Sequence, residues 1–256
     1  MPENPDEERS RFLVQLVHVA KASALLVDLD ETLLDHGRMP AAIASTCDAV
    51  AAAYPGVDAR RLRQANADAW LSYWPEVEQL CWLGGMDGFA VSREAWRRAL
   101  LACGTSDEAV VEYAFERHQR FSRAAYRLFA DAADLLAQVA HSGMRIALVT
   151  NGSTDLQRDK LRVLGIEGLF HAVVISAEIG AAKPDPAPFL LALRHLGVEP
   201  ANAWHVGDSL ITDVAGAKAA GLCAVWLNRH GASIGDGFRP DIEVASLTEV
   251  GARLAA

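Results

Sequence analysis

The sequence predicts an α/β protein with a parallel sheet that helices cover on both faces. Short, continuously apolar runs that stop at polar residues are typical of buried strands. Helical patterns separate the later runs, and strands that alternate with helices form parallel sheets. The chain has 256 residues, of which 51% are hydrophobic, and this length suffices for one large domain or for a domain with a substantial insertion.

The elements follow in order along the chain. Residues 11–20 are expected to form a short amphipathic helix, and the apolar run Ala22–Val27 is expected to form the first buried strand. Four later apolar runs predict further strands at 145–150, 171–176, 203–206 and 223–227. Helical patterns follow the second and third strands, and Gly165 and Gly197 are expected to end these two helices.

A long segment between the first and second strands contains no comparable strand run. The stretch from about Arg38 to Arg123 is rich in Ala, Arg, Leu and Trp at helical spacing, which predicts an all-helical insertion. Four of the six tryptophans fall inside it: Trp70, Trp74, Trp82 and Trp96.

Composition and charge restrict the class of protein. The net charge of −9 argues against a general nucleic-acid-binding or anionic-membrane-binding protein, because such proteins usually carry an excess of positive charge. The acidic N-terminus lacks the features of a signal peptide, and no apolar run approaches the ~18 residues of a membrane span. The four cysteines show no metal-binding spacing, so they are expected to be reduced, mostly buried thiols of a cytoplasmic protein: Cys47, Cys81, Cys103 and Cys223.

Polar residues follow four of the predicted strands, at the carboxyl end where ligands of open α/β sheets gather. They are Asp28 and Asp30 after the first strand, Thr150, Asn151 and Gly152 after the second, Lys183 in the loop after the third, and Gly207, Asp208 and Asp213 after the fourth. We therefore expect these side chains to converge on one crevice.

The polar residues at the other strand ends make a catalytic role for Asp28 and Asp30 more plausible than the pair alone would. Two residues apart in an extended segment, both carboxylates point to the same side, although a turn or a helix cap would explain the pair alone. Two such carboxylates ~4 Å apart repel by about 4 kcal/mol at an effective dielectric of about 20. A hard divalent cation bound by oxygens, with Lys183 opposite, offsets this repulsion, and Mg²⁺ fits such a site beside a substrate phosphate.

Four segments, in order, resemble the four motifs of the haloacid dehalogenase superfamily of phosphatases and related hydrolases: DLDETL (28–33), LVTNGS (148–153), AAKPDPAPF (181–189) and VGDSLITD (206–213). The resemblance implies a Rossmann-like catalytic core at residues 1–37 and 124–256 and a mobile helical cap of the C1 type at residues 38–123. It also implies Mg²⁺-dependent hydrolysis of a small phosphate monoester, with no nucleic acid or membrane partner. Oligomeric state stays open.

The resemblance also implies a role for each matching residue. Asp28 corresponds to the nucleophile that forms an aspartyl-phosphate, and Asp30 corresponds to the general acid and base. Asp28, the backbone carbonyl of Asp30 and Asp208 would hold Mg²⁺, with Asp213 supporting that shell directly or through water. Thr150 would hydrogen-bond a phosphoryl oxygen, helped by the backbone at Asn151 and Gly152. Lys183 would neutralise the nucleophile and the phosphoryl group.

Other activities remain open alternatives. The stretches LVTNGSTDLQRDKL, AVWLNRHG and SREAWRRAL look like the N-acylneuraminate-9-phosphatase and pyrimidine-nucleotidase-like group, which favours a sugar phosphate or nucleotide-like substrate. Hydrolytic dehalogenases of the superfamily lack an acid at the position of Asp30, so a dehalogenase is disfavoured. An intramolecular phosphotransferase (mutase), a phosphoprotein phosphatase and a non-catalytic phosphate-ligand binder are kept as further alternatives.

Residues of the insertion are expected to select the substrate. The candidates for contact with the leaving group are Arg93, Trp74, Trp82 and the flexible Gly84–Gly85. For the tryptophans, packing between helices is the favoured alternative. His36, six residues past Asp30, is a candidate for the site mouth, with a surface turn as the favoured alternative.

Overall fold

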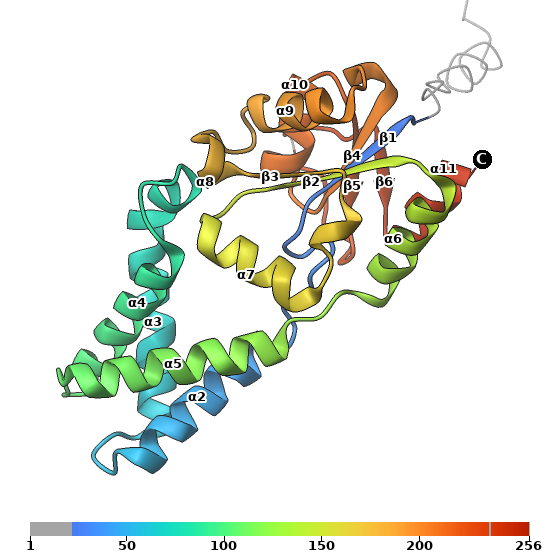
Figure 1. Cartoon of the computed structure of the whole chain (residues 1–256). Coiled ribbons are helices and arrows are strands. Elements are labelled where there is room, and N and C mark those ends of the chain that lie inside the picture. The colour runs from blue at the N-terminus through green and yellow to red at the C-terminus, as the bar shows by residue number, and fades with distance from the viewer. Residues whose placement is uncertain (1–21, 236, 256) are drawn as a thin grey trace, which may run out of the picture.

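The computed structural model describes residues 22–235 and 237–255, so the helix expected at residues 11–20 lies outside the described residues. Six strands form one sheet in the order β3-β2-β1-β4-β5-β6, and every neighbouring pair is parallel (Figure 1). The strands are β1 (Ala24–Val27), β2 (Arg145–Thr150), β3 (Ala172–Ile175), β4 (Ala203–Gly207), β5 (Cys223–Leu227) and β6 (Ile242–Val244).

The helices fall into two sets. Four long helices follow β1 and make up the insertion: α2 (Met39–Ala53), α3 (Ala59–Trp82), α4 (Gly88–Ala102) and α5 (Glu108–Ala125). The others flank or follow the strands: α6 (Ala130–Ser142), α7 (Thr154–Leu164), α8 (Ser176–Ile179), α9 (Ala187–Leu196), α10 (Ala215–Ala219) and α11 (Leu247–Ala255). Short turns of 3₁₀ helix at Glu167–Leu169 (η1) and Pro200–Asn202 (η2) and of π-helix at Leu210–Val214 (η3) complete the fold.

Helices cover both faces of the sheet, as predicted. In β1, Leu25 and Val27 belong to the apolar core shared with α6, α7 and α11, whereas Ala24 and Leu26 belong to the core shared with α9 and α10. All four residues are fully buried. This alternation explains why the strand has no polar residue, since each of its side chains lies in one of two apolar layers.

Five predicted strands are present, with ends that differ by two residues at most, and the predicted fold class is confirmed. Gly165 and Gly197 end α7 and α9 in the left-handed conformation, with φ of 68° and 62°, which favours glycine. The sequence did not reveal β6. This edge strand has three residues with the exposed Glu243 at its centre, so it carries no continuous apolar run.

The helices α2–α5 form a bundle beside the sheet (Figure 1). They enclose two apolar cores that are separate from those of the sheet, one around Leu62, Trp96 and Leu100 and a smaller one around Tyr73 and Val77. The helical character of the insertion is therefore as predicted. Aspartates begin three of these helices, because the side chains of Asp58, Asp87 and Asp107 accept hydrogen bonds from backbone N–H groups of the first turns of α3, α4 and α5.

The four cysteines are free thiols, and Cys47 and Cys81 are buried. No helix within residues 22–235 and 237–255 combines the length and the apolar character that crossing a bilayer demands.

A partly buried histidine in the insertion predicts that the folded protein loses stability in acid. The ring of His118 on α5 lies 5.4 Å from that of Trp96, and burial lowers the pKa of His118 from 6.5 to about 4. Between these pH values the unfolded chain binds a proton that the folded chain does not. Folding stability should therefore fall as the pH drops from about 6.5 towards 4, by up to about 3 kcal/mol.

The variant His118→Gln cannot take up this proton and should lose that part of the pH dependence. The measurement is the free energy of urea unfolding at several pH values across this window. An equal acid-induced loss of stability in the variant and the parent protein would show that His118 is not the cause.

Candidate active site

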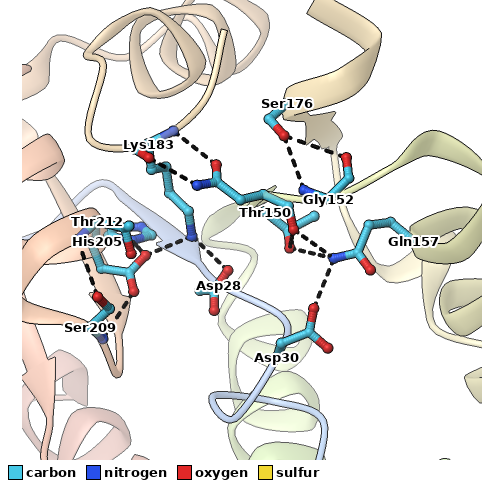
Figure 2. Close-up of polar contacts among 12 residues, drawn as sticks. Asp28, Asp30, Thr150, Gly152, Gln157, Ser176, Lys183, His205, Ser209 and Thr212 are labelled. Atoms are coloured by element: carbon cyan, nitrogen blue, oxygen red, sulfur yellow. Dashed lines mark hydrogen bonds and ion pairs between the residues drawn. The ribbon is translucent and has the colours of Figure 1, made fainter. Parts of the chain in front are cut away.

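The carboxyl ends of β1, β2 and β4 lie side by side, because β1 pairs with β2 on one side and with β4 on the other. The chain continues from β1 to β2 on one side and from β4 to β5 on the other, and ligands of open α/β sheets bind at the crevice between two such strands. Lys183 reaches toward Asp28 there, and Thr150 lies nearby in contact with Gln157 (Figure 2). The structure thus brings together residues from the strand ends that the sequence singled out.

Lys183 joins two carboxylates at the centre of the crevice. Its Nζ donates hydrogen bonds to Oδ1 of Asp28 and to Oδ1 of Asp213, each at 2.6 Å. All three side chains are buried. Asn151 fixes the position of this lysine, since its Oδ1 accepts from the Lys183 N–H at 2.8 Å and its Nδ2 donates to the Lys183 carbonyl at 2.9 Å. The sequence did not predict this role for the Asn151 side chain.

The carboxylates of the crevice have shifted pKa values. Burial raises the pKa of Asp28, a rise that Lys183 opposes and the carboxylate of Asp213 strengthens. Asp213 is buried too, but Lys183 and His205 hold the pKa of Asp213 well below its usual range. Partial burial and the charge of Asp213 raise the pKa of Asp208 to about 6, although Asp208 is the exposed member of the group.

Asp213 is held by several protein groups behind the crevice. His205 Nε2 lies 3.0 Å from its Oδ1, and the Ser209 N–H donates to its Oδ2 at 3.1 Å. Gly207 leaves the room for this arrangement, because a Cβ there would collide with the Asp213 carboxyl group. His205 was not predicted as a site residue, because it lies within an apolar strand and only the folded structure brings Asp213 to its ring.

Asp28, Asp208 and Asp213 fit a divalent cation. One carboxylate oxygen of each lies within 4.8 Å of the others. Such a set offers only hard oxygen donors, which suit Mg²⁺ rather than a softer metal. Both oxygens of Asp213 already accept hydrogen bonds from the protein, so Asp213 fits a supporting role better than Asp28 and Asp208 do.

Asp30 lies in a second polar cluster at the mouth of the crevice. Lys160 Nζ lies 2.7 Å and His36 Nε2 2.7 Å from its Oδ1, and Gln157 Nε2 donates to its Oδ2 at 2.9 Å. Partial burial raises the pKa of Asp30, but Lys160 and His36 outweigh this effect and hold it well below its usual range. Glu31, the next residue, has φ of 58°, and among the described residues other than glycine it alone has a positive φ. Such local strain is typical of functional sites.

The cluster around Asp30 decides between two interpretations of His36. The ring contacts Asp30 and lines the cavity, so the surface turn favoured from the sequence was wrong. Gln157 and Lys160 were missed altogether. They lie three residues apart on one face of α7, the helix that begins just past Thr150, and this spacing is the signal that could have revealed them.

Thr150 and Gly152 lie opposite Asp28 at the end of β2. Gln157 Nε2 donates to Thr150 Oγ1 at 2.7 Å, and the Thr150 hydroxyl donates to the Asn151 carbonyl at 3.4 Å, a long contact that a stronger acceptor could replace. The Gly152 N–H donates to Ser176 Oγ at 3.0 Å (Figure 2). This N–H therefore has a partner within the protein, although Gly152 was predicted to bind the substrate.

These groups line a cavity of about 440 Å³ between the sheet and the helical insertion. Volumes of ~300–1,000 Å³ are typical of small-molecule sites. The insertion contributes Trp70, Trp74, Cys81, Trp82, Gly88 and Val91 to its wall. Trp74 and Trp82 are thus cavity residues, which corrects the favoured view that they only pack between helices.

Two other substrate-contact candidates were wrong. Arg93 is absent from the cavity wall. Its Nε donates to Glu112 Oε2 at 2.9 Å, and its guanidinium lies 4.2 Å from the centre of the Phe115 ring. Gly84 and Gly85 do not line the cavity either. Gly84 instead packs against the backbone of Ala177, where a side chain would collide.

The insertion is docked on the core beside the cavity. Asp155 on α7 accepts hydrogen bonds from the first two N–H groups of α4, at 3.0 Å from Gly88 and 2.7 Å from Phe89. A Cβ at Gly88 would collide with Ser153 and Leu156. The start of α4 therefore lies directly against the loop that follows β2.

A family model described as haloacid dehalogenase-like hydrolase matches residues 22–221. The "phosphoserine phosphatase" of Thermus thermophilus is 36% identical over 88% of this chain and 96% of its own length. The human "N-acylneuraminate-9-phosphatase" is 40% identical, over only 34% of this chain and 36% of its own length. The resemblance to the superfamily is confirmed, and so is the resemblance to the N-acylneuraminate-9-phosphatase group.

A solved structure of similar fold is the "2-haloacid dehalogenase" of Pseudomonas syringae. It superposes with a TM-score of 0.66, covers 91% of this chain and 98% of its own, and is 27% identical.

Proposed function

Because this chain belongs to the haloacid dehalogenase-like hydrolases and is similar to a phosphatase over 88% of its length, we propose a specific phosphatase reaction for it. The reaction is Mg²⁺-dependent hydrolysis of a small phosphate monoester, a sugar phosphate or a nucleotide-like compound, through an aspartyl-phosphate on Asp28. The observation that carries the proposal is the ammonium of Lys183, held 2.6 Å from the Asp28 carboxylate at the meeting point of the strand ends.

In the first step, an oxygen of Asp28 attacks the phosphorus and the bond from phosphorus to the leaving-group oxygen breaks. Asp30 gives a proton to the departing alkoxide. In the second step, water attacks the same phosphorus, Asp30 takes the water proton, and the bond from phosphorus to Asp28 breaks. Thr150 donates its hydroxyl hydrogen to a phosphoryl oxygen. Lys183 balances the charge that develops on the transferred group, because it is already oriented there.

The surroundings of Asp30 suit the base step, since Lys160 and His36 favour the ionised carboxylate. For the acid step, the Lys160 ion pair must loosen. The proposed metal ligands are Asp28, the Asp30 backbone carbonyl and Asp208, with Asp213 as support. Bound there, Mg²⁺ would polarise the phosphate and neutralise the carboxylates.

Residues 38–123 are proposed to move as the cap that covers the site, with 1–37 and 124–256 as the catalytic core. The four free cysteines support a cytoplasmic location. The mutase alternative has little support, because the insertion brings no cation to the cavity wall that would hold a second phosphate. The presence of Asp28, Asp30 and Lys183 together argues against a non-catalytic binder, and Asp30 argues against a dehalogenase.

The test of the proposal is phosphate release from a broad panel of phosphate esters by the purified protein with Mg²⁺. Chelation should abolish release, and added Mg²⁺ should restore it. Full turnover of an activated ester in excess chelator would contradict the metal requirement, and inactivity on every ester would contradict the reaction.

The role of Asp30 predicts a dependence on the leaving group. Asp30→Asn should lower the rate of hydrolysis of an alkyl phosphate by about 10²–10⁴-fold, because the departing alkoxide needs the proton. With an aryl phosphate, whose phenol is an acidic leaving group, the same substitution should lower the rate of the first step much less. Since the second step also uses Asp30, rapid-mixing kinetics should show a burst of phenol followed by slow turnover. Equal losses on both esters without a burst would make Asp30 a structural or metal-binding residue only.

A further inference from the structure

Three tryptophans of α3 form one side of the cavity. Trp70, Trp74 and Trp82 line the same cavity as Asp28 and Thr150, and each of the three is partly exposed. Trp70 and Trp74 are one helical turn apart, with ring centres separated by 6.0 Å. Trp74 Nε1 donates to Glu78 Oε1 at 2.9 Å, which fixes the orientation of that ring. We call these three residues the aromatic wall.

Contacts with the core hold the aromatic wall over the site. The segment after Trp82 is anchored at Gly84, which packs on the backbone of Ala177, and at Gly88, whose N–H donates to Asp155. These anchors come from α8 and α7, the helices that follow β3 and β2. The wall is therefore held against the same cavity that Asp28 and Thr150 line.

The charges around the cavity restrict what can lie against this wall. None of the residues that the insertion contributes to the lining is charged. The rest of the lining carries five carboxylates against Lys160, Lys183 and His36. Each of these three basic side chains already contacts Asp28, Asp30 or Asp213. A carboxylate on the leaving group would find no unpaired cationic side chain among the described lining residues.

From this geometry we infer that the leaving group is uncharged and presents a flat ring to the aromatic wall, as a nucleoside does. The inference rests on the proposed phosphatase reaction and narrows its substrate class to nucleoside 5′-monophosphates. Each base that stacks on an aromatic side chain gains roughly five- to a hundredfold in affinity. The cavity volume of about 440 Å³ suits a ligand of this size.

The first test compares uridine 5′-monophosphate with ribose 5-phosphate, which has the same phosphate and sugar but no base, and with phosphoserine, whose leaving group carries a carboxylate. We expect kcat/KM for the nucleotide to exceed both others by about tenfold or more. Equal values for nucleotide and ribose 5-phosphate, or a preference for phosphoserine, would overturn the inference while leaving the phosphatase reaction intact.

Substitutions in the aromatic wall test whether its tryptophans cause the preference for the nucleotide. Trp82→Leu and Trp74→Leu should each lower the ratio of kcat/KM for nucleotide over ribose 5-phosphate, mainly through KM. Leu71→Ala is the matched control, because Leu71 lies on the same helix and is 80% exposed away from the cavity. The control should keep the parent ratio. An unchanged ratio in both tryptophan variants would overturn the inference.

A binding measurement separates the two proposals. Calorimetry with Asp28→Asn measures affinity without turnover, and uridine 5′-monophosphate should bind more tightly than ribose 5-phosphate. If this preference were found while no ester released phosphate with the parent protein, the phosphatase reaction would be wrong and the aromatic wall would still be a nucleotide site. The absence of any preference would overturn the inference directly.

Discussion

Asp28→Asn is expected to lower phosphate release by roughly 10³-fold or more on every ester, since the amide cannot act as the nucleophile. The fold should survive. Burial raises the pKa of Asp28, so the carboxylate is held in a place that disfavours its charge, and the neutral isostere removes that cost. Lys183 keeps its second partner, Asp213, at 2.6 Å.

Thermal unfolding of the Asp28→Asn variant should therefore occur at the parent temperature or above it. Circular dichroism and calorimetry check the fold, and a discontinuous phosphate assay checks the activity. A variant that kept about a tenth of parental turnover would show that another group attacks the phosphorus. A loss of activity accompanied by strong destabilisation would leave the chemical role of Asp28 without support.

Lys183→Met is expected to lose activity and also stability. Its ammonium is the counter-ion of two buried carboxylates, and removing one partner of a buried ion pair destabilises a protein by about 3–5 kcal/mol. The methionine keeps most of the side-chain volume, so the loss reports on charge rather than on a cavity. The measurement is the free energy of urea unfolding.

The double variant Asp28→Asn, Lys183→Met tests whether this cost comes from the unpaired carboxylate. It should be more stable than Lys183→Met alone, by a coupling of about 1–3 kcal/mol. Additive effects of the two substitutions would mean that Lys183 stabilises the loop by packing and not by its contact with Asp28.

The sequence was informative about this site because the polar residues stand at the ends of apolar strands. The runs 24–27 and 203–207 are buried throughout, so the first aspartates after them had to lie at the carboxyl edge of the sheet. Parallel pairing then brings separate strand ends together. For the same reason the short β6 could not be predicted, since its central Glu243 breaks the apolar run.

Other site residues could not be predicted because their role depends on tertiary contacts. His205 belongs to a buried strand, and only the packing of η3 brings Asp213 to its ring. In α3, tryptophans at helical spacing are equally consistent with a helix-helix core and with a cavity wall. The close packing of Gly88 against Ser153 and Leu156 brings this part of the insertion to the core, and Trp82 there lines the cavity. The arginine expected there, Arg93, instead pairs with Glu112 on a neighbouring helix.

The proposed reaction requires Asp28 to become covalently phosphorylated during turnover. The most direct measurement is rapid quenching of the Asp30→Asn variant during turnover of an aryl phosphate, followed by peptide mass mapping. In this variant the intermediate should accumulate. We expect one phosphoryl group on the peptide that contains Asp28, labile as an acyl phosphate is, and absent from a parallel sample of Asp28→Asn. Release of phenol and phosphate with no phosphoryl group on the protein, or with that group on another residue, would contradict the account.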